Sequence, residues 1–229
     1  HNDVEYIIVD GLSTDGSMDI INRYRDRIDK IISEKDSGMY EAINKGIRIC
    51  TGDIVGLMHS DDQFSTPRVL SAIANTFEKT NADIVYANGL FVSPDQGNTV
   101  RKWHSGNYSR SKIKHGWLPL HTTVYVKKIV FDLCGLYNES YRIAADSDMQ
   151  VRLFYVHDFK VHFMDKYIVK MNMGGLSTSI HTLYRKFFED YRMYRSHGFV
   201  PVTSMSLKII SKIPQFARGF AHRINEIYV

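Results

Sequence analysis

Residues 6–17 read YIIVDGLSTDGS, and this stretch decides the fold. Four apolar residues, 6–9, end abruptly at Asp10, and small, polar and acidic residues follow. A short apolar run with a sharp polar end predicts a strand that is buried on both faces of a parallel sheet. Asp10 then has two interpretations: it caps the turn into a following helix, or it binds a ligand at the end of the strand.

The composition of the 229-residue chain argues against several classes of protein. The 29 Lys and Arg residues against 25 Asp and Glu give a net charge of only +4, so nucleic-acid binding is not expected. Only two cysteines occur, Cys50 and Cys134, without a Cys-x-x-Cys pair. A disulfide framework and a zinc cluster are therefore not expected, and a reducing, cytoplasmic location is predicted. No apolar run approaches the ~18 residues that span a bilayer.

A pattern of strand followed by helix repeats along the first ninety residues. Helices are predicted over residues 17–24, 39–49 and 67–80, and further strands over residues 54–58 and 83–87. Strands that alternate with helices predict an α/β fold with a Rossmann-like, mostly parallel sheet flanked by helices.

The second half of the chain is less regular. A turn at residues 93–98 predicts a hairpin, and a loop runs to residue 118. A strand is predicted over 122–126, a helix from 127 and another over 145–157, and the chain beyond 176 is mostly helical and basic. We therefore expect a domain over residues 1–180 and a helical extension over residues 181–229.

Acidic residues follow two of the predicted strands, which places them at the carboxyl edge of the sheet, where open α/β folds bind ligands. Asp10 follows the first strand, and Asp61 and Asp62 follow the strand over 54–58. Adjacent carboxylates repel each other unless a cation or hydrogen-bond donors hold them. Mg²⁺ or Mn²⁺ is commonly held by one or two carboxylates plus substrate phosphates. Since no P-loop and no dinucleotide fingerprint occurs, the pair predicts a metal that neutralises a diphosphate.

Four segments together resemble the inverting family 2 glycosyltransferases, which have the GT-A fold, and especially the bacterial enzymes of surface-polysaccharide and lipid-linked glycan synthesis. The segments are EYIIVDGLSTDGS, SEKDSGMYEAINKGIRICTGDIVGLMHSDD, ESYRIAADSDMQVRL and MGGLST, in that order over about residues 3–180. The resemblance implies a nucleotide-sugar donor, usually a UDP-sugar, and a divalent metal at an acidic motif. It also implies that the chain begins at the family's second strand.

The resemblance assigns a nucleotide-binding role to several residues. Those expected near the nucleotide are Asp10, Gly11, Ser13, Asp36, Asn44, Lys45 and Asp61. Asp61 and Asp62 match the metal and ribose carboxylates, and which of them binds the metal stays open. His59 departs from the pattern, because many relatives carry an acid there.

Asp146 matches the catalytic base at the start of a helix, although Ala145 replaces the glutamate that is common before it. In-line attack by an acceptor hydroxyl needs a carboxylate within ~3 Å of that hydroxyl. The alternative for Asp146 and Asp148 is an N-terminal helix charge, and Asp148 is expected to support the site. His121 is either structural or near the acceptor. Gly174 and Gly175 match a loop that closes over the donor.

The predicted protein is thus a metal-dependent inverting glycosyltransferase that uses Mn²⁺ or Mg²⁺ and acts on a glycan or lipid-linked acceptor. The alternatives are a nucleotidyltransferase, a metal-dependent phosphohydrolase, or a non-catalytic nucleotide-sugar-binding relative. The basic, amphipathic stretch over 204–229 either packs on the protein or lies at the inner face of a membrane, and a lipid-linked acceptor favours the membrane. The oligomeric state cannot be predicted.

Overall fold

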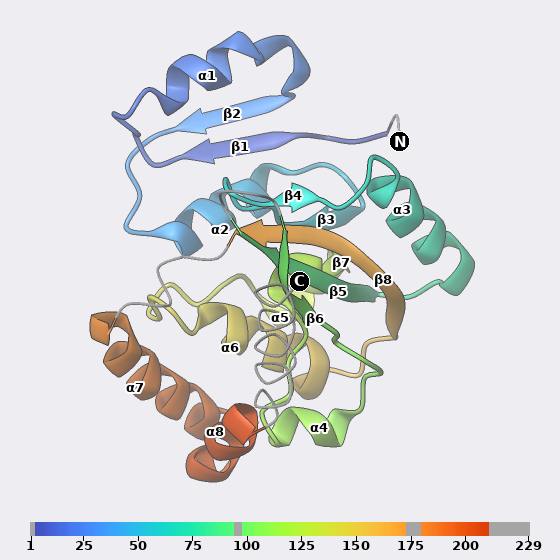
Figure 1. The fold of residues 1–229 in the computed structure, drawn as a ribbon, viewed down its shortest axis with the longest axis vertical. Helices are drawn as coiled ribbons and strands as arrows, with labels where there is room; N and C mark the ends of the chain where they lie inside the picture. The colour runs from blue at the N-terminus through green and yellow to red at the C-terminus, as the bar shows by residue number, and fades with distance from the viewer. Residues whose placement is uncertain (1–2, 94–97, 173–179, 211–229) are drawn as a thin grey trace, which may run out of the picture.

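The computed structural model of the protein describes residues 3–93, 98–172 and 180–210, with the backbone alone for 180–183 (Figure 1). The strands are β1 (Ile7–Asp10), β2 (Lys30–Ser33), β3 (Ile54–Gly56), β4 (Gln63–Phe64), β5 (Ile84–Val92), β6 (Thr99–Trp103), β7 (Tyr125–Lys127) and β8 (Val161–Asn172). The α-helices are α1 (Ser17–Arg23), α2 (Met39–Ile49), α3 (Val69–Thr80), α4 (Arg110–Lys114), α5 (Ile129–Cys134), α6 (Ala145–Val151), α7 (Ile180–Ser196) and α8 (Pro201–Ile210). Short 3-10 turns, η1 (Arg25–Arg27) and η2 (His121–Thr123), and a π-helical turn, η3 (Arg152–Val156), complete them.

The opening stretch forms the strand that its sequence predicts. β1 pairs in parallel with β2, from Ile7 opposite Lys30 to Asp10 opposite Ser33. The two strands make a small sheet of their own, at the top of Figure 1. The α-helix over Met39–Ile49 has the predicted bounds.

The larger sheet has the strand order β3-β7-β5-β8-β4, with β6 also paired to β5. The α/β class is confirmed, but this sheet is mixed where a mostly parallel one was predicted. β5 and β8 are parallel, whereas the β3–β7, β5–β7, β4–β8 and β5–β6 pairs are antiparallel. Apolar runs report burial and not strand direction, so the sequence could not reveal the reversed strands. The hairpin predicted around residues 93–98 is confirmed as β5–β6.

Three segments of the second half differ from the prediction. The helix expected over 145–157 is α6 followed by the π-helical turn, and the strand expected over 122–126 begins only at Tyr125, after a 3-10 turn. β8, the longest strand, was missed because charged residues such as Asp165 and Lys166 interrupt its apolar residues. Its burial comes from pairing with β5 and β4 and not from composition.

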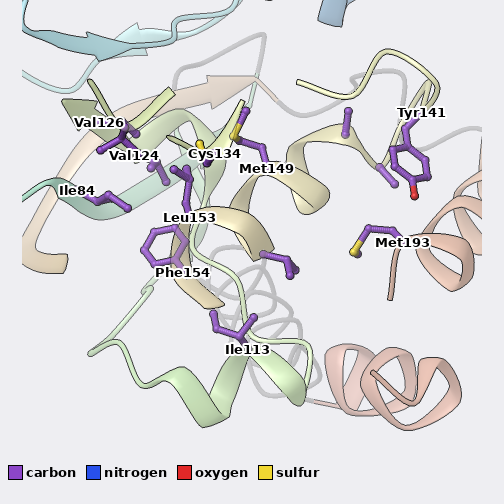
Figure 2. Close-up of a cluster of buried hydrophobic side chains, with 14 of the residues drawn as sticks. Ile84, Ile113, Val124, Val126, Cys134, Tyr141, Met149, Leu153, Phe154 and Met193 are labelled. Carbon is purple, nitrogen blue, oxygen red and sulfur yellow. The ribbon is translucent and has the colours of Figure 1, made fainter. Parts of the chain in front are cut away.

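The core lies on both faces of β5, whose residues 84–87 are at most 1% exposed. Ile84 and Tyr86 face the larger apolar cluster, which contains Met149 and Phe154 (Figure 2). Their neighbours in β5 face a second cluster beneath α3. This alternation follows from the two-residue period of a strand.

The C-terminal helices share that larger cluster. Met193 and Tyr194 of α7 and Met205 of α8 are buried in it, as is Phe199 between the two helices. Figure 2 shows Met193 on α7 beside the segment that carries Tyr141. Among the described residues, no helix has the length and hydropathy needed to cross a membrane.

Both cysteines of the chain are buried and form no disulfide. Burial raises the pKa of the Cys50 thiol and of the Cys134 thiol above the ordinary value. Both side chains therefore stay protonated at neutral pH and act as small apolar groups.

Alanine substitutions at two glycines, Gly116 and Gly198, can measure how closely α8 packs against the segment that contains residue 116. Gly116 and Gly198 both have a positive φ, of 77° and 73°, but only Gly116 has a close neighbour: a Cβ there would lie 2.4 Å from the Ser204 carbonyl oxygen. We expect Gly198→Ala to lower the free energy of unfolding by roughly 1–2 kcal/mol, the cost of the left-handed conformation. Gly116→Ala adds overpacking and should cost roughly 2–5 kcal/mol, measured by urea unfolding. Equal losses would mean that α8 does not pack against residue 116.

Candidate active site

Asp10 ends β1 and is held in a tight turn. Its carboxylate accepts hydrogen bonds from the Ser13 N–H (3.1 Å), the Leu12 N–H (3.1 Å) and the Ser33 hydroxyl (2.7 Å), and the residue is 8% exposed. The bonds from Ser13 and Ser33 hold the pKa of Asp10 below its ordinary value, so it is ionised. Leu12 takes a positive φ of 65°, which is uncommon for a leucine, and its side chain is exposed. Asp10 therefore stabilises the turn that follows β1, in addition to any role in ligand binding.

The turn after β1 lies against the turn after β2. A Cβ on Gly11 would approach the Asp36 Oδ2 atom to 2.6 Å, so a side chain at position 11 would displace the Asp36 carboxylate. Asp36 in turn accepts a hydrogen bond from the Gly38 N–H at 3.0 Å. The structure thus brings together four of the predicted nucleotide-binding residues, Asp10, Gly11, Ser13 and Asp36, at the carboxyl edge of the β1–β2 pair.

Asn44 and Lys45 have partners within the protein. Asn44 is 1% exposed, donates to the Tyr137 carbonyl and the Glu139 carboxylate, and accepts from the Tyr137 N–H. Lys45 pairs with Glu34 at 3.0 Å and with Glu41 at 3.1 Å. Asn44 therefore links α2 to residues 137–139 by hydrogen bonds, and Lys45 links α2 to the segment after β2 by its ion pair with Glu34.

Asp61 and Asp62 follow β3, as the sequence predicts. Both carboxylate oxygens of Asp62 are buried, and neither has a hydrogen-bond partner among the described residues. Burial, together with the charge of Asp61, raises the pKa of Asp62 to about 6. The side chain of Asp61 is exposed, and its carbonyl accepts a hydrogen bond from Asn172 (3.0 Å), at the end of β8.

The donor set around Asp62 fits a hard divalent cation. Within the described parts of the chain, no three or more His, Cys, Asp or Glu side chains converge on one point. Mg²⁺ and Mn²⁺ do not need such a cage, because they use one or two carboxylates together with substrate phosphates and water. A buried carboxylate with no partner is costly, and a cation would remove that cost.

A chain of contacts leads from the end of β3 to Asp146 at the start of α6. The Nε2 atoms of His59 and His121 are 2.9 Å apart, so one ring donates to the other. The Nδ1 atom of His121 lies 3.5 Å from Asp146 Oδ2, and the Tyr40 hydroxyl lies 3.5 Å from Asp146 Oδ1. Burial and the neighbouring His121 lower the pKa of His59, which favours a neutral ring there.

Asp148 has partners on neighbouring elements. It is 5% exposed and accepts hydrogen bonds from Arg152 (3.0 Å), with His197 Nε2 at 2.9 Å. Burial opposes its ionisation, but the hydrogen bond from His197 and the charge of Arg152 outweigh burial and hold its pKa below the ordinary value. Asp148 therefore joins α6, the π-helical turn and the end of α7. Gly174 and Gly175, the predicted loop glycines, lie outside the described residues.

Comparison with known proteins decides the family. The sequence model described as "Glycosyl transferase family 2" matches residues 1–132, more than half of the chain. The chain belongs to glycosyl transferase family 2. It is therefore a glycosyltransferase, and the nucleotidyltransferase and phosphohydrolase alternatives are set aside.

Named relatives of this glycosyltransferase include a biosynthetic glycosyltransferase and a chondroitin synthase. A "PGL/p-HBAD biosynthesis glycosyltransferase" of Mycobacterium bovis is 28% identical over 183 residues, which are 78% of this chain and 69% of that protein. The chondroitin synthase of Escherichia coli is 28% identical over 185 residues, 79% of this chain but only 26% of the synthase.

Solved structures confirm the GT-A fold. The S. aureus protein TarS, in complex with UDP-GlcNAc, has a TM-score of 0.60 at 15% identity, over 94% of this chain and 70% of that one. The mannosyltransferase PcManGT from Pyrobaculum calidifontis, in complex with GDP-Man and Mn²⁺, has a TM-score of 0.59 at 16% identity, over 96% and 66%.

Sequence reasoning missed two side chains that touch this site. Tyr40 reaches Asp146 from α2, and His59 was seen only as a departure from the family pattern. Tyr40 stands four residues before Asn44, on the same face of α2, and this spacing was the only available signal for it. The pairing of His59 with His121, 62 residues apart, has no local signal at all.

The raised pKa of Asp62 predicts a pH dependence of stability in metal-free buffer. Between about pH 4 and pH 6 the folded protein holds a proton on Asp62 that the unfolded chain has released, so its free energy of unfolding falls as the pH rises. Asp62→Asn should abolish this fall and be more stable than the wild type at pH 7. Urea unfolding in EDTA across this range measures it. Asp61→Asn, a change at the exposed neighbour, is the control and should keep most of the fall in the free energy of unfolding. If the wild type and Asp62→Asn showed the same change of unfolding free energy with pH, the raised pKa of Asp62 would be contradicted.

Proposed function

We propose that this glycosyltransferase moves a sugar from a UDP-sugar to a hydroxyl of a glycan or lipid-linked acceptor, with inversion and with a divalent metal. The observation that carries the proposal is the contact chain from His59 through His121 to Asp146. It links the acidic motif after β3 to a carboxylate on α6 that is 28% exposed and so open to a substrate.

The donor would lie across the edge formed by the ends of β1, β2 and β3. Asp10, with Gly11 and Ser13, and Asp36 on the facing turn would receive the base and ribose. Asp61 would contact the ribose or share the metal. The complexes of TarS with UDP and UDP-GlcNAc support a uridine nucleotide, while the GDP-Man complex of PcManGT keeps guanine in the panel to be tested.

Asp62, with Asp61 beside it, would hold Mn²⁺ or Mg²⁺. The ion would neutralise the charge that develops on the departing diphosphate. The Mn²⁺ complex of PcManGT supports this assignment, as do the oxygens of Asp62, which have no hydrogen-bond partner within residues 3–93, 98–172 and 180–210.

Asp146 would act as the general base. The acceptor oxygen attacks the anomeric carbon of the sugar and forms the new C–O bond as its proton passes to Asp146. The bond from that carbon to the diphosphate breaks on the opposite face, and the nucleoside diphosphate leaves with the electron pair. His121 and Tyr40, one beside each carboxylate oxygen, would fix the orientation of Asp146.

Nucleotide release from a panel of UDP-, GDP- and dTDP-sugars with Mn²⁺ tests this mechanism. Asp146→Asn should lower the rate of glycosyl transfer by roughly 10²–10⁴-fold, the usual contribution of a general base. Asp132→Asn, the same change at an exposed carboxylate of α5, is the matched control and should leave the rate unchanged. No release with any donor, or release that survives Asp146→Asn, would contradict the proposal; donor binding without turnover would identify a non-catalytic relative.

We also propose that the protein works in the cytoplasm and contacts the inner face of the membrane through α7. The described outer face of α7 is aromatic, with Tyr184 72%, Phe187 56% and Phe188 51% exposed, and Arg195 is exposed beside them. The two acids of this helix are turned inward: the Glu189 side chain is 12% and the Asp190 side chain 9% exposed. An apolar surface with exposed positive and buried negative charge fits an anionic lipid surface. Of the basic, amphipathic stretch predicted over 204–229, residues 204–210 lie in α8, where Ser204 and Met205 are buried, and the rest lies outside the described residues.

Vesicle sedimentation tests this contact. The protein should bind phosphatidylcholine vesicles that contain phosphatidylglycerol, and salt should weaken the binding. Phe187→Ser with Phe188→Ser should lower the affinity by about tenfold or more, since burying two exposed aromatic side chains contributes more than 1.4 kcal/mol. Ile129→Ser with Leu133→Ser, which removes two exposed apolar groups of α5, is the control. Equal loss in both pairs, or no binding by the wild type, would contradict the role of α7.

A further inference from the structure

One carboxylate on the C-terminal helices organises the segment that leads into α6. Glu189 of α7 accepts hydrogen bonds from three successive backbone N–H groups: those of Arg142 (3.0 Å), Ile143 (2.8 Å) and Ala144 (3.0 Å). All three go to the Oε2 atom, and Arg142 also reaches Oε1 at 3.1 Å. The Glu189 side chain is only 12% exposed, so these bonds form away from bulk water, where charge-assisted hydrogen bonds are strong.

These N–H groups need a partner from elsewhere in the chain. They lie immediately before α6, at a place where backbone donors have no partner inside the helix. The residue at the N-cap is Ala144. Glu189, 45 residues further along the chain, accepts from the N–H of Ala144, as the glutamate three residues into a helix does in a capping box.

The same segment is held from the other side by α2. The Tyr40 hydroxyl donates to the Ile143 carbonyl oxygen at 2.9 Å and lies 3.5 Å from Asp146 Oδ1. Residue 143 thus has its N–H bound to α7 and its carbonyl bound to α2. Asp146 follows three residues later, so the position of its carboxylate depends on both contacts.

We infer that Glu189 is a positioning residue for Asp146: by binding the three N–H groups of residues 142–144, it sets where the Asp146 carboxylate meets the acceptor hydroxyl. The inference rests on the proposed role of Asp146 as general base. It makes α7 part of the catalytic framework, although the sequence predicts the helix as an extension beyond the catalytic domain.

Steady-state kinetics of the full chain with two variants of α7 test the inference. Glu189→Gln keeps the size of the side chain but removes the negative charge that strengthens the three hydrogen bonds, and it leaves one acceptor oxygen in place of two. We expect kcat to fall 10- to 100-fold, while the dissociation constant of the UDP-sugar, measured by calorimetry, changes less than threefold. Glu189→Asp keeps the charge with a shorter reach and should show a smaller fall in kcat.

Asp190→Asn is the matched control. Asp190 is the next residue of the same helix, equally buried, and it pairs with Lys208 of α8 at 3.1 Å and not with residues 142–144. This variant should lose thermal stability yet keep kcat within about twofold below its Tm. If Glu189→Gln folds and keeps its kcat, or if both variants lose kcat in proportion to their lost stability, the inference is overturned.

The experiment separates this inference from the proposed function. Loss of activity in Asp146→Asn with an unchanged kcat in Glu189→Gln would overturn only the positioning role. Full activity in Asp146→Asn would overturn the proposed base, whatever Glu189 does. If Glu189→Gln does not fold, the decision falls to Glu189→Asp: a kcat equal to that of the wild type overturns the inference, and a lowered kcat with unchanged donor affinity supports it.

Discussion

The parallel pairing of β5 with β8 is the interaction on which the rest of the structure depends. The two strands run together from Ile84 opposite Val161 to Val92 opposite Asn172, and β5 also holds β6 and β7. β8 ends at Asn172, whose side chain donates a hydrogen bond to the Asp61 carbonyl oxygen. The pairing of β5 with β8 therefore also helps to position the acidic motif after β3. The buried apolar faces of β5 then fix the helices on each side, including the one that carries Asp146.

The carboxylates around the site differ in the number of hydrogen-bond donors that surround them, and their pKa values differ as a result. Asp10 and Asp148 are nearly inaccessible, and each is surrounded by donors, so each stays ionised and orders its neighbours. The carboxylate oxygens of Asp62 are buried without such donors in the part of the chain that the structure describes, and Asp62 resists ionisation. A carboxylate whose oxygens all accept hydrogen bonds stabilises the fold around it. A buried carboxylate without hydrogen-bond donors lowers the stability of the fold, and a bound ligand can remove that loss.

The sequence predicted the parts of this site that have a local signal or a family motif. An apolar run that ends in acid marked Asp10 and Asp62, and the resemblance to family 2 glycosyltransferases marked Asp146 and Asp148. It could not predict β8, because its apolar residues are interrupted by charge, or the reversed strands, because burial carries no direction. The contacts of Glu189 and of His59 join residues 45 and 62 positions apart, and only the folded chain brings those together.

The burial of both thiols has a practical consequence for observing this enzyme at work. Cys50 and Cys134 are the only cysteines in the chain, and neither presents a reactive thiolate at neutral pH. A cysteine introduced on the exposed aromatic face of α7 would thus be modified well ahead of them. A single fluorophore or spin label could be attached there without first removing a native residue. The native chain is, in effect, already prepared for site-specific spectroscopy.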